Sequence, residues 1–213
     1  MKYWCSFPDF PALLVNMTHP ALILASSSPY RAELLDRLKL EYTAISPDID
    51  ESRHAQESPR DYVQRLSQEK AAEIAKTNPE AMIIGSDQCA VHEGEILTKP
   101  GSVENAETQL TRFSGSTVQF LTGLCLLDAA NNSVQLDVVE FNVHFRALSN
   151  TEIKRYIELE MPLDCAGSFK SEGLGVTLFE RVQGDDPTAL VGLPLIRLCS
   201  FLRETGMQLP PAS

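Results

Sequence analysis

The residues in this chain best suited to chemistry are acids, cations and hydroxyls. They are the acids Asp48, Asp50, Glu51 and Asp87, the cations Arg31, Lys70 and Lys99, and the hydroxyl run Ser26 to Ser28. Carboxylates combined with cations favour phosphoryl chemistry, because carboxylates hold a hard divalent metal while lysine and arginine neutralise phosphate charge. No Ser-His-Asp or Cys-His pattern accompanies them. The four histidines do not cluster in the sequence, and His54 and His92 are expected in exposed connections.

The hydroxyl run lies between a short apolar segment and the start of a helix. Leu22 to Ala25 predicts a buried strand, and Ser28 followed by Pro29 is a favourable N-cap and first-turn pair for a helix over about 29–39. Unpaired backbone N–H groups and the positive end of a helix dipole attract anions. This loop therefore predicts a phosphate site that includes Ser26 and Ser28.

Arg31 occupies an unusual position on that helix. On a helical wheel it falls between Leu34, Leu35 and Leu38, at the head of the apolar face. A charge there either meets an anionic ligand or reaches water along its aliphatic stem. These residues alone leave both alternatives open.

Lys70 raises the same question on the next helix. Ser58 begins a helix predicted over about 58–77, in which Val63, Leu66 and Ile74 form one apolar stripe. Lys70 lies in the middle of this stripe, where an ammonium group is costly unless it is paired or faces a polar cavity. The alternative is that its charge snorkels to water, which the helix taken alone slightly favours.

A third candidate group follows the apolar run Met82 to Ile84. This strand is expected to end abruptly at Asp87 and Gln88, as the first strand ends at the serine run. Ligands of open α/β sheets bind beyond the carboxyl ends of strands, so both groups are expected to face one crevice. The alternative makes Asp87 a turn-capping residue. Lys99 follows a hairpin expected over Val91 to Leu97. It lies on a connection from which its side chain is free to extend.

The rest of the chain alternates between helices and strands, which indicates an α/β fold. A short strand is expected near 42–45, helices near 102–113, 149–160 and 191–204, long antiparallel strands over 116–128 and 133–147, and a ligand-approaching loop over 165–173. No repeat or linker divides the sequence, so residues 17–213 are expected to form a single domain. Residues 1–16 are expected to be a disordered or mis-started extension before Met17, because prolines interrupt any signal-peptide core.

Composition excludes several classes of protein. With 213 residues, 43% of them hydrophobic and 22% charged, the chain suits a globular domain and neither a disordered nor a membrane protein. A formal net charge of −11 without any basic run argues against nucleic-acid binding, which needs clustered lysine and arginine. Five scattered cysteines form neither a disulfide framework nor a metal-binding spacing, which favours a reducing cytoplasm.

Seven fragments resemble, in order and spacing, those of the Maf family of nucleoside triphosphate pyrophosphatases. They cover almost all of residues 21–206 and are Leu22 to Arg31, Asp50-Glu51, Gln68 to Ala71, Gly85 to Gln88, Lys99-Pro100, Ala166 to Ser168 and Val191 to Pro194. The resemblance implies a cytoplasmic, metal-dependent enzyme that cleaves a nucleoside triphosphate between the α and β phosphates. It also implies a twisted mixed sheet with flanking helices, similar to that of inosine triphosphatases. A cleft between two lobes and a homodimer are further implied features.

The resemblance also implies roles for the candidate residues. Asp87 matches the family's catalytic acid, which accepts a proton from the attacking water. Arg31, Lys70 and Lys99 match its phosphate-binding cations, and Glu51 matches an acid implicated in binding Mg²⁺ or Mn²⁺. A charged ligand would explain why the first two cations lie on inward faces. Whether Asp87 acts as base or as metal ligand stays open, since a carboxylate that holds a metal is a poor base.

The family divides by substrate at three positions, which here are Tyr30, Gln88 and Glu172. This combination is similar to the branch that hydrolyses 7-methyl-GTP, although that branch usually carries tryptophan at position 30. N7-methylation makes guanine cationic, so Tyr30 offers a cation–π contact of roughly 0.5–2 kcal/mol while Glu172 accepts hydrogen bonds from the base. The alternatives are a pyrophosphatase for pyrimidine or non-standard nucleotides, and a non-catalytic nucleotide-binding regulator of cell division.

Overall fold

The computed structural model describes residues 20–211, so the expected extension over 1–16 and the start at Met17 lie outside the described residues. The strands are β1 (Leu22–Ala25), β2 (Thr43–Ala44), β3 (Met82–His92), β4 (Glu95–Leu97), β5 (Thr117–Asp128), β6 (Ser133–Phe145) and β7 (Phe179–Gln183). The helices are α1 (Pro29–Asp36), α2 (Pro59–Ala75), α3 (Val103–Phe113), α4 (Asn150–Glu160) and α5 (Leu195–Glu204), with the short 3-10 helices η1 (Leu174–Leu178) and η2 (Pro187–Val191).

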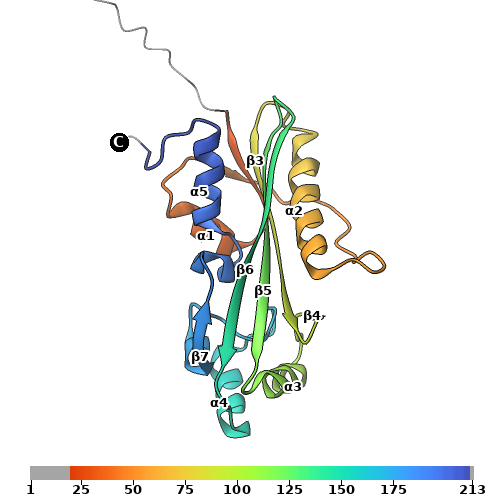
Figure 1. Ribbon diagram of the computed structural model, residues 1–213, viewed down its shortest axis with the longest axis vertical. Helices are drawn as coiled ribbons and strands as arrows, with labels where there is room; N and C mark the ends of the chain where they lie inside the picture. The colour runs from red at the N-terminus through yellow and green to blue at the C-terminus, as the bar shows by residue number, and fades with distance from the viewer. Residues whose placement is uncertain (1–19, 212–213) are drawn as a thin grey trace, which may run out of the picture.

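One seven-stranded sheet organises these elements in the order β2-β1-β3-β5-β6-β7, with β4 paired to β3 outside that path. β1 pairs in parallel with β2 and β3, and the other strand pairs are antiparallel. The long strands β5 and β6 run the length of the molecule (Figure 1). The predicted α/β fold, a twisted mixed sheet with flanking helices, is confirmed.

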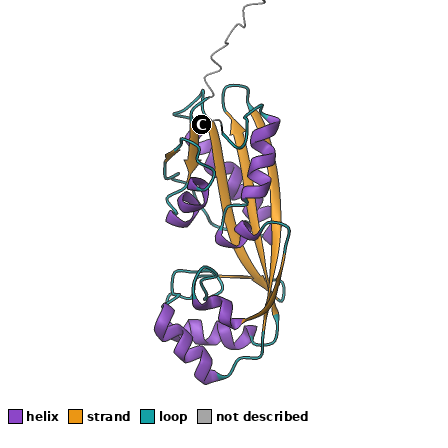
Figure 2. Ribbon diagram, turned by 90° about the vertical axis from the view of Figure 1, so that its left-hand side faces the viewer, coloured by secondary structure: helices purple, strands orange, loops and turns teal. Residues whose placement is uncertain are grey.

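The helices cover both faces of the sheet in the first lobe. Leu22 and Leu24 of β1 pack with α1 and α5, whereas the alternate residues Ile23 and Ala25 pack against α2 (Figure 1). In the second lobe, α3 and α4 gather at the far end of the long strands around a core rich in phenylalanine (Figure 2). Among the described residues, no helix combines the length and the apolar composition needed to cross a bilayer.

β3 differs most from its prediction. It continues to His92 through unbroken antiparallel pairing with β5, so Asp87 lies within the strand and is neither its last residue nor a turn cap. Polar residues can occupy this strand because β1 stops pairing with it at Gly85, which leaves one edge facing a cavity. His92 is only 3% exposed and bonds to Ser116, so its expected place in an exposed connection was wrong.

The first and last helices are shorter than predicted. α1 ends at Asp36 instead of near residue 39, and Lys39 has a left-handed backbone with φ 56°. α5 begins at Leu195 instead of near 191, because Gly192 takes φ 118° and separates η2 from the helix. The later start of α5 leaves irregular backbone at Gly192, which lines the cavity described next.

Candidate active site

A large cavity opens where β1 ends and β3 continues. Its volume is about 710 Å³, and it is bounded by the serine loop, α2, β3, the turn after β4 and the loop over 164–172. Every predicted site residue lines it: Ser26, Ser28, Tyr30, Arg31, Glu51, Lys70, Asp87, Gln88, Lys99 and Glu172. The structure therefore brings the candidates together from both lobes, and their roles in binding and catalysis stay predictions.

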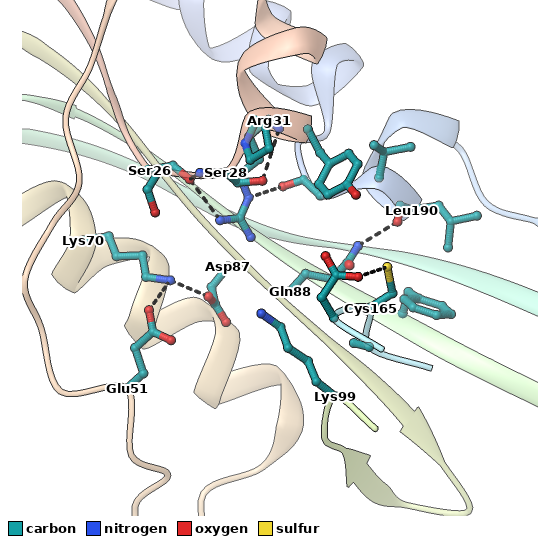
Figure 3. A pocket seen from close by; sticks show the side chains of 18 of the residues that line it. Ser26, Ser28, Arg31, Glu51, Lys70, Asp87, Gln88, Lys99, Cys165 and Leu190 are labelled. Atoms are coloured by element: carbon teal, nitrogen blue, oxygen red, sulfur yellow. Dashed lines mark hydrogen bonds and ion pairs between the residues drawn. The ribbon is translucent and has the colours of Figure 1, made fainter. Parts of the chain in front are cut away.

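A lysine shared by two carboxylates lies at the centre of this cavity. Lys70 Nζ lies 2.6 Å from Asp87 Oδ1 and 2.8 Å from Glu51 Oε1 (Figure 3). Lys70 is 6% exposed and Asp87 is 8% exposed, so the pair is largely removed from water. An unpaired ammonium at this depth would be strongly destabilising. The paired site, and not snorkelling, accounts for the inward position of Lys70.

Two glycines let α2 approach the sheet closely enough for that contact. A Cβ atom on Gly85 would lie 2.0 Å from the carbonyl oxygen of Ser67, and one on Gly123 would lie 2.3 Å from the carbonyl oxygen of Val63. Gly123 is also the β5 partner of Asp87, so no side chain stands beside the carboxylate on that face of the sheet. The close approach of α2 to the sheet is therefore needed for the contact between Lys70 and Asp87.

Ser67 joins the helix to the sheet at the same point. Its Oγ accepts a hydrogen bond from the backbone N–H of Asp87 at 3.0 Å and donates one to the carbonyl of Val63 at 2.6 Å. Ser67 is fully buried and satisfies a backbone donor that β1, already ended, leaves unpaired. The pattern-based prediction missed this residue, although a serine within an apolar helical stripe, three residues before Lys70, is a detectable signal.

Arg31 is held in place by the loop that precedes α5 and by the serine run. Its Nε donates to the carbonyl of Gly192 at 2.9 Å, and its Nη1 donates to Ser26 Oγ at 3.3 Å (Figure 3). Burial lowers the pKa of the guanidinium, and the carboxylates of Asp87 and Glu51 oppose this shift. The arginine thus lines the cavity instead of extending to bulk water, as the ligand-facing alternative predicts.

The remaining candidates of the serine loop and the β4 turn complete a cationic region. Ser28 caps α1 by accepting from the N–H of Arg31 at 3.4 Å, and Ser26 Oγ accepts from the N–H of Ser28 at 3.1 Å. Lys99 is exposed and points toward Asp87 from the side opposite Lys70 (Figure 3). Three cations from α1, α2 and the β4 turn therefore surround one carboxylate.

The other end of the cavity is aromatic and acidic. Tyr30, Phe120 and Phe169 line it, together with the carboxylates of Asp164 and Glu172. Burial is the main cause that raises the pKa of Tyr30, and the negative charges of these two acids add to the shift. The predicted pair Tyr30 and Glu172 therefore lies together, and Asp164 is an additional acid that the sequence patterns did not single out.

Lys170 belongs to the same loop as these acids, and its ammonium group bonds to the end of α4. Its Nζ donates to the carbonyl of Glu160 at the end of α4, at 3.1 Å. Its backbone N–H donates to the hydroxyl of Tyr156 at 3.0 Å, which fixes the loop on α4. Both contacts therefore hold the loop over 164–172 on α4.

Gln88 supports the wall of the cavity through its amide nitrogen. Nε2 donates to the carbonyls of Ala189 and Leu190 in η2, at 2.6 and 3.1 Å (Figure 3). Asp186 holds the other side of η2, because its carboxylate accepts from the N–H of Thr188 at 3.1 Å and from that of Ile196 at 2.7 Å. These contacts hold η2 beside the cavity, which Gln88 itself also lines.

The oxygen donors present suit a hard divalent cation. Mg²⁺ and Mn²⁺ take one or two protein carboxylates and complete their shell with water and phosphate oxygens, and Glu51 and Asp87 offer two carboxylates. Only Oδ1 of Asp87 accepts hydrogen bonds from side chains among residues 20–211, which leaves Oδ2 available. No group of three or more His, Cys, Asp or Glu side chains in the described part of the chain is arranged to hold a metal. The donor set fits a metal bound jointly with a phosphate ligand.

Comparison with known proteins identifies the family of this chain. A family model described as Maf-like protein matches residues 21–205. The chain belongs to the Maf family. A Maf relative from Pseudomonas aeruginosa is 56% identical over 191 residues, which cover 90% of this chain and 100% of the relative. Another from Alcanivorax borkumensis is 54% identical over 191 residues, which cover 90% of this chain and 97% of the relative.

Both Maf relatives bear the name 7-methyl-GTP pyrophosphatase. Among solved structures, the Ham1 protein of Staphylococcus aureus aligns with a TM-score of 0.44 and 13% identity, over 87% of this chain and 99% of that one. Membership of the Maf family rests on the sequence matches, and it confirms the resemblance carried by the seven fragments.

Proposed function

We propose that this Maf protein hydrolyses 7-methyl-GTP to 7-methyl-GMP and diphosphate. The observation that carries the proposal is the polarity of the cavity, with cations around Asp87 at one end and aromatic and acidic side chains at the other. The substrate has the complementary polarity, since its triphosphate is anionic and its methylated base is cationic. The names of the relatives at 54–56% identity support the same substrate.

Arg31, Lys70 and Lys99 bind the triphosphate and orient its α-phosphorus toward Asp87. Water attacks the α-phosphorus, the bridging bond to the β-phosphate breaks, and diphosphate leaves with the bonding electrons. Asp87 orients this water and accepts its proton through Oδ2, because Oδ1 bonds to Lys70. Glu51 would hold Mg²⁺ or Mn²⁺, which would supply additional positive charge to the phosphate oxygens, while Oδ2 of Asp87 serves as the base.

The base is selected at the aromatic end. The ring of Tyr30 stacks on the methylated guanine, where the positive charge strengthens the contact. Glu172 accepts hydrogen bonds from N1–H and N2–H of the base, and its charge balances that of the ring. GTP makes the same hydrogen bonds but lacks the positive charge, so it is bound less tightly.

A panel of nucleoside triphosphates tests the substrate directly. We expect pyrophosphate release with Mg²⁺ or Mn²⁺ to be fastest, in kcat/KM, on 7-methyl-GTP, slower on GTP, and lowest on UTP and dTTP. Chelation of the metal with EDTA is expected to stop turnover, and restoring the metal to recover it. Clear preference for UTP or dTTP would refute the proposed substrate, and nucleotide binding without any turnover would favour the regulatory alternative.

Glu172→Gln tests the charge at the base site. We expect it to lower the kcat/KM ratio of 7-methyl-GTP to GTP by about tenfold. Both bases make the hydrogen bonds, but only the methylated base loses an attraction between unlike charges, which is on the order of 1–4 kcal/mol at about 4 Å. Glu180→Gln is the matched control, since Glu180 is exposed on β7 and does not line the cavity. An unchanged ratio in the Glu172 variant would remove this carboxylate from base selection.

A further inference from the structure

Glu51 reaches the cavity from a segment that has no regular secondary structure. Residues 45–58 join β2 to α2 without a helix or strand. The Glu51 side chain is 58% exposed and bonds to Lys70. A carboxylate on such a segment is placed by whatever fixes the backbone around it. The contacts between this segment and α2 therefore decide where Glu51 lies.

Arg65 of α2 makes three hydrogen bonds to this segment. Its Nε and Nη2 donate to the two carboxylate oxygens of Glu57, at 2.7 and 2.9 Å. Nη2 also donates to the carbonyl of Ser52 at 3.0 Å, and Nη1 donates to Glu69 at 3.0 Å. The side chains of Arg65 and Glu57 are 17% and 8% exposed, so this is a largely buried pair and not a surface one.

Further contacts link Arg65 and Glu57 to the backbone of Glu51. The hydroxyl of Tyr62, one turn before Arg65, donates to the backbone carbonyl of Glu51 at 3.0 Å. The Arg65 guanidinium lies 5.7 Å from the centre of the Tyr62 ring. The N–H of His54 donates to the Glu57 carboxylate at 3.0 Å. The carboxylate of Glu57 therefore bonds both to another residue of the segment and to α2. The hydrogen bonds from Arg65 are the main reason why the pKa of Glu57 falls to about 2.

We propose that Arg65 and Glu57 are positioning residues, which hold the segment over 45–58 on α2 and so place Glu51 beside Lys70 for the phosphate and metal. The inference rests on the proposed function only for the role of Glu51. Arginine suits this task because its planar fork bonds both carboxylate oxygens of Glu57 in a bidentate pair, while another of its N–H groups reaches the carbonyl of Ser52. Lys70 and Arg65 lie five residues apart on α2, so one helix holds both the cation and the acid that faces it.

Hydrogen exchange tests the positioning without reference to activity. In Arg65→Ala we expect amides within 45–58 to exchange at least tenfold faster than in the wild type, while the amides of α5 are unchanged. Arg60→Ala is the matched control, because Arg60 is an arginine of α2 that pairs with a glutamate of the sheet, Glu140, instead of the segment. Unchanged exchange over 45–58 in the Arg65 variant would overturn the inference.

A double-mutant cycle tests whether Arg65 acts through Glu51. We expect Arg65→Ala and Glu51→Gln each to raise the Mg²⁺ concentration for half-maximal rate by about tenfold, and the double variant to show no further increase. Additive effects would overturn the inference. Failure of the proposed function looks different, since the wild type would then lack 7-methyl-GTP turnover while faster exchange in Arg65→Ala would persist.

Discussion

Asp87→Asn is expected to lower pyrophosphate release from 7-methyl-GTP by at least about a hundredfold, in the range lost with a general base. The amide has nearly the shape of the carboxylate but accepts no proton from water and is a weaker metal ligand. Nucleotide affinity is expected to persist, because Arg31, Lys70 and Lys99 remain and one negative charge beside the phosphates is removed. Turnover assays at saturating substrate and calorimetric titration with a non-hydrolysable analogue measure the two effects separately.

Asp185→Asn provides the control for this substitution. Asp185 is exposed, lies beside η2 and does not line the cavity, so its loss removes the same charge without touching the site. We expect turnover within about twofold of the wild type, as is usual for a surface substitution. Unaltered turnover in Asp87→Asn would exclude this carboxylate from the mechanism.

Gly85→Ala is expected to destabilise the protein by about 2–4 kcal/mol, at the upper end of the cost of overpacking a core. The new methyl group would stand 2.0 Å from the backbone oxygen of Ser67, which belongs to α2 and cannot rotate away. Relief requires α2 to move off the sheet, which lengthens the contact between Lys70 and Asp87. Urea unfolding measures the loss of stability, and turnover of the folded variant measures the displacement.

Gly173→Ala separates this effect from a general cost of replacing glycine. The atoms nearest to its Cβ atom would be those of the Glu160 carboxylate, from 2.8 Å, which is the far end of a flexible side chain. We expect a loss below about 1 kcal/mol, the size of an ordinary small substitution. Equal losses in the two variants would contradict the role given to the close approach of α2.

The places of Arg31 and Lys70 on the apolar faces of their helices could be predicted because helical periodicity is a local property, but periodicity left open whether each charge meets a ligand or snorkels to water. Each cation interrupts an apolar stripe, and such an interruption is visible in a single sequence. The course of β3 through Asp87 could not be read in the same way, because a run of Ser, Asp and Gln is typical of the end of a strand. Its continuation depends on pairing with β5, which lies more than 30 residues away along the chain.

Residues whose role depends on a tertiary partner account for most of what was missed. The serine at position 67 is visible within its apolar stripe, but its role depends on the N–H of Asp87, and Arg65 is an ordinary helical residue until its partner, the carboxylate of Glu57, is known. Gly123 carries a clearer signal, since a glycine within a long apolar strand often marks the close approach of another backbone. Its meaning here depends on the register that sets it beside Asp87.

The unbroken course of β5 fixes the distance between the two ends of the cavity. The strand carries Phe120 at the aromatic end of the cavity and Gly123 beside Asp87, and three residues of extended backbone span about 10 Å. Because both residues belong to one hydrogen-bonded strand, the distance between them cannot change to fit the ligand. In the proposed function, the sheet therefore fixes the distance between the base site and the attacked phosphorus, and a nucleotide whose anhydride lies at another distance from its base would not meet Asp87.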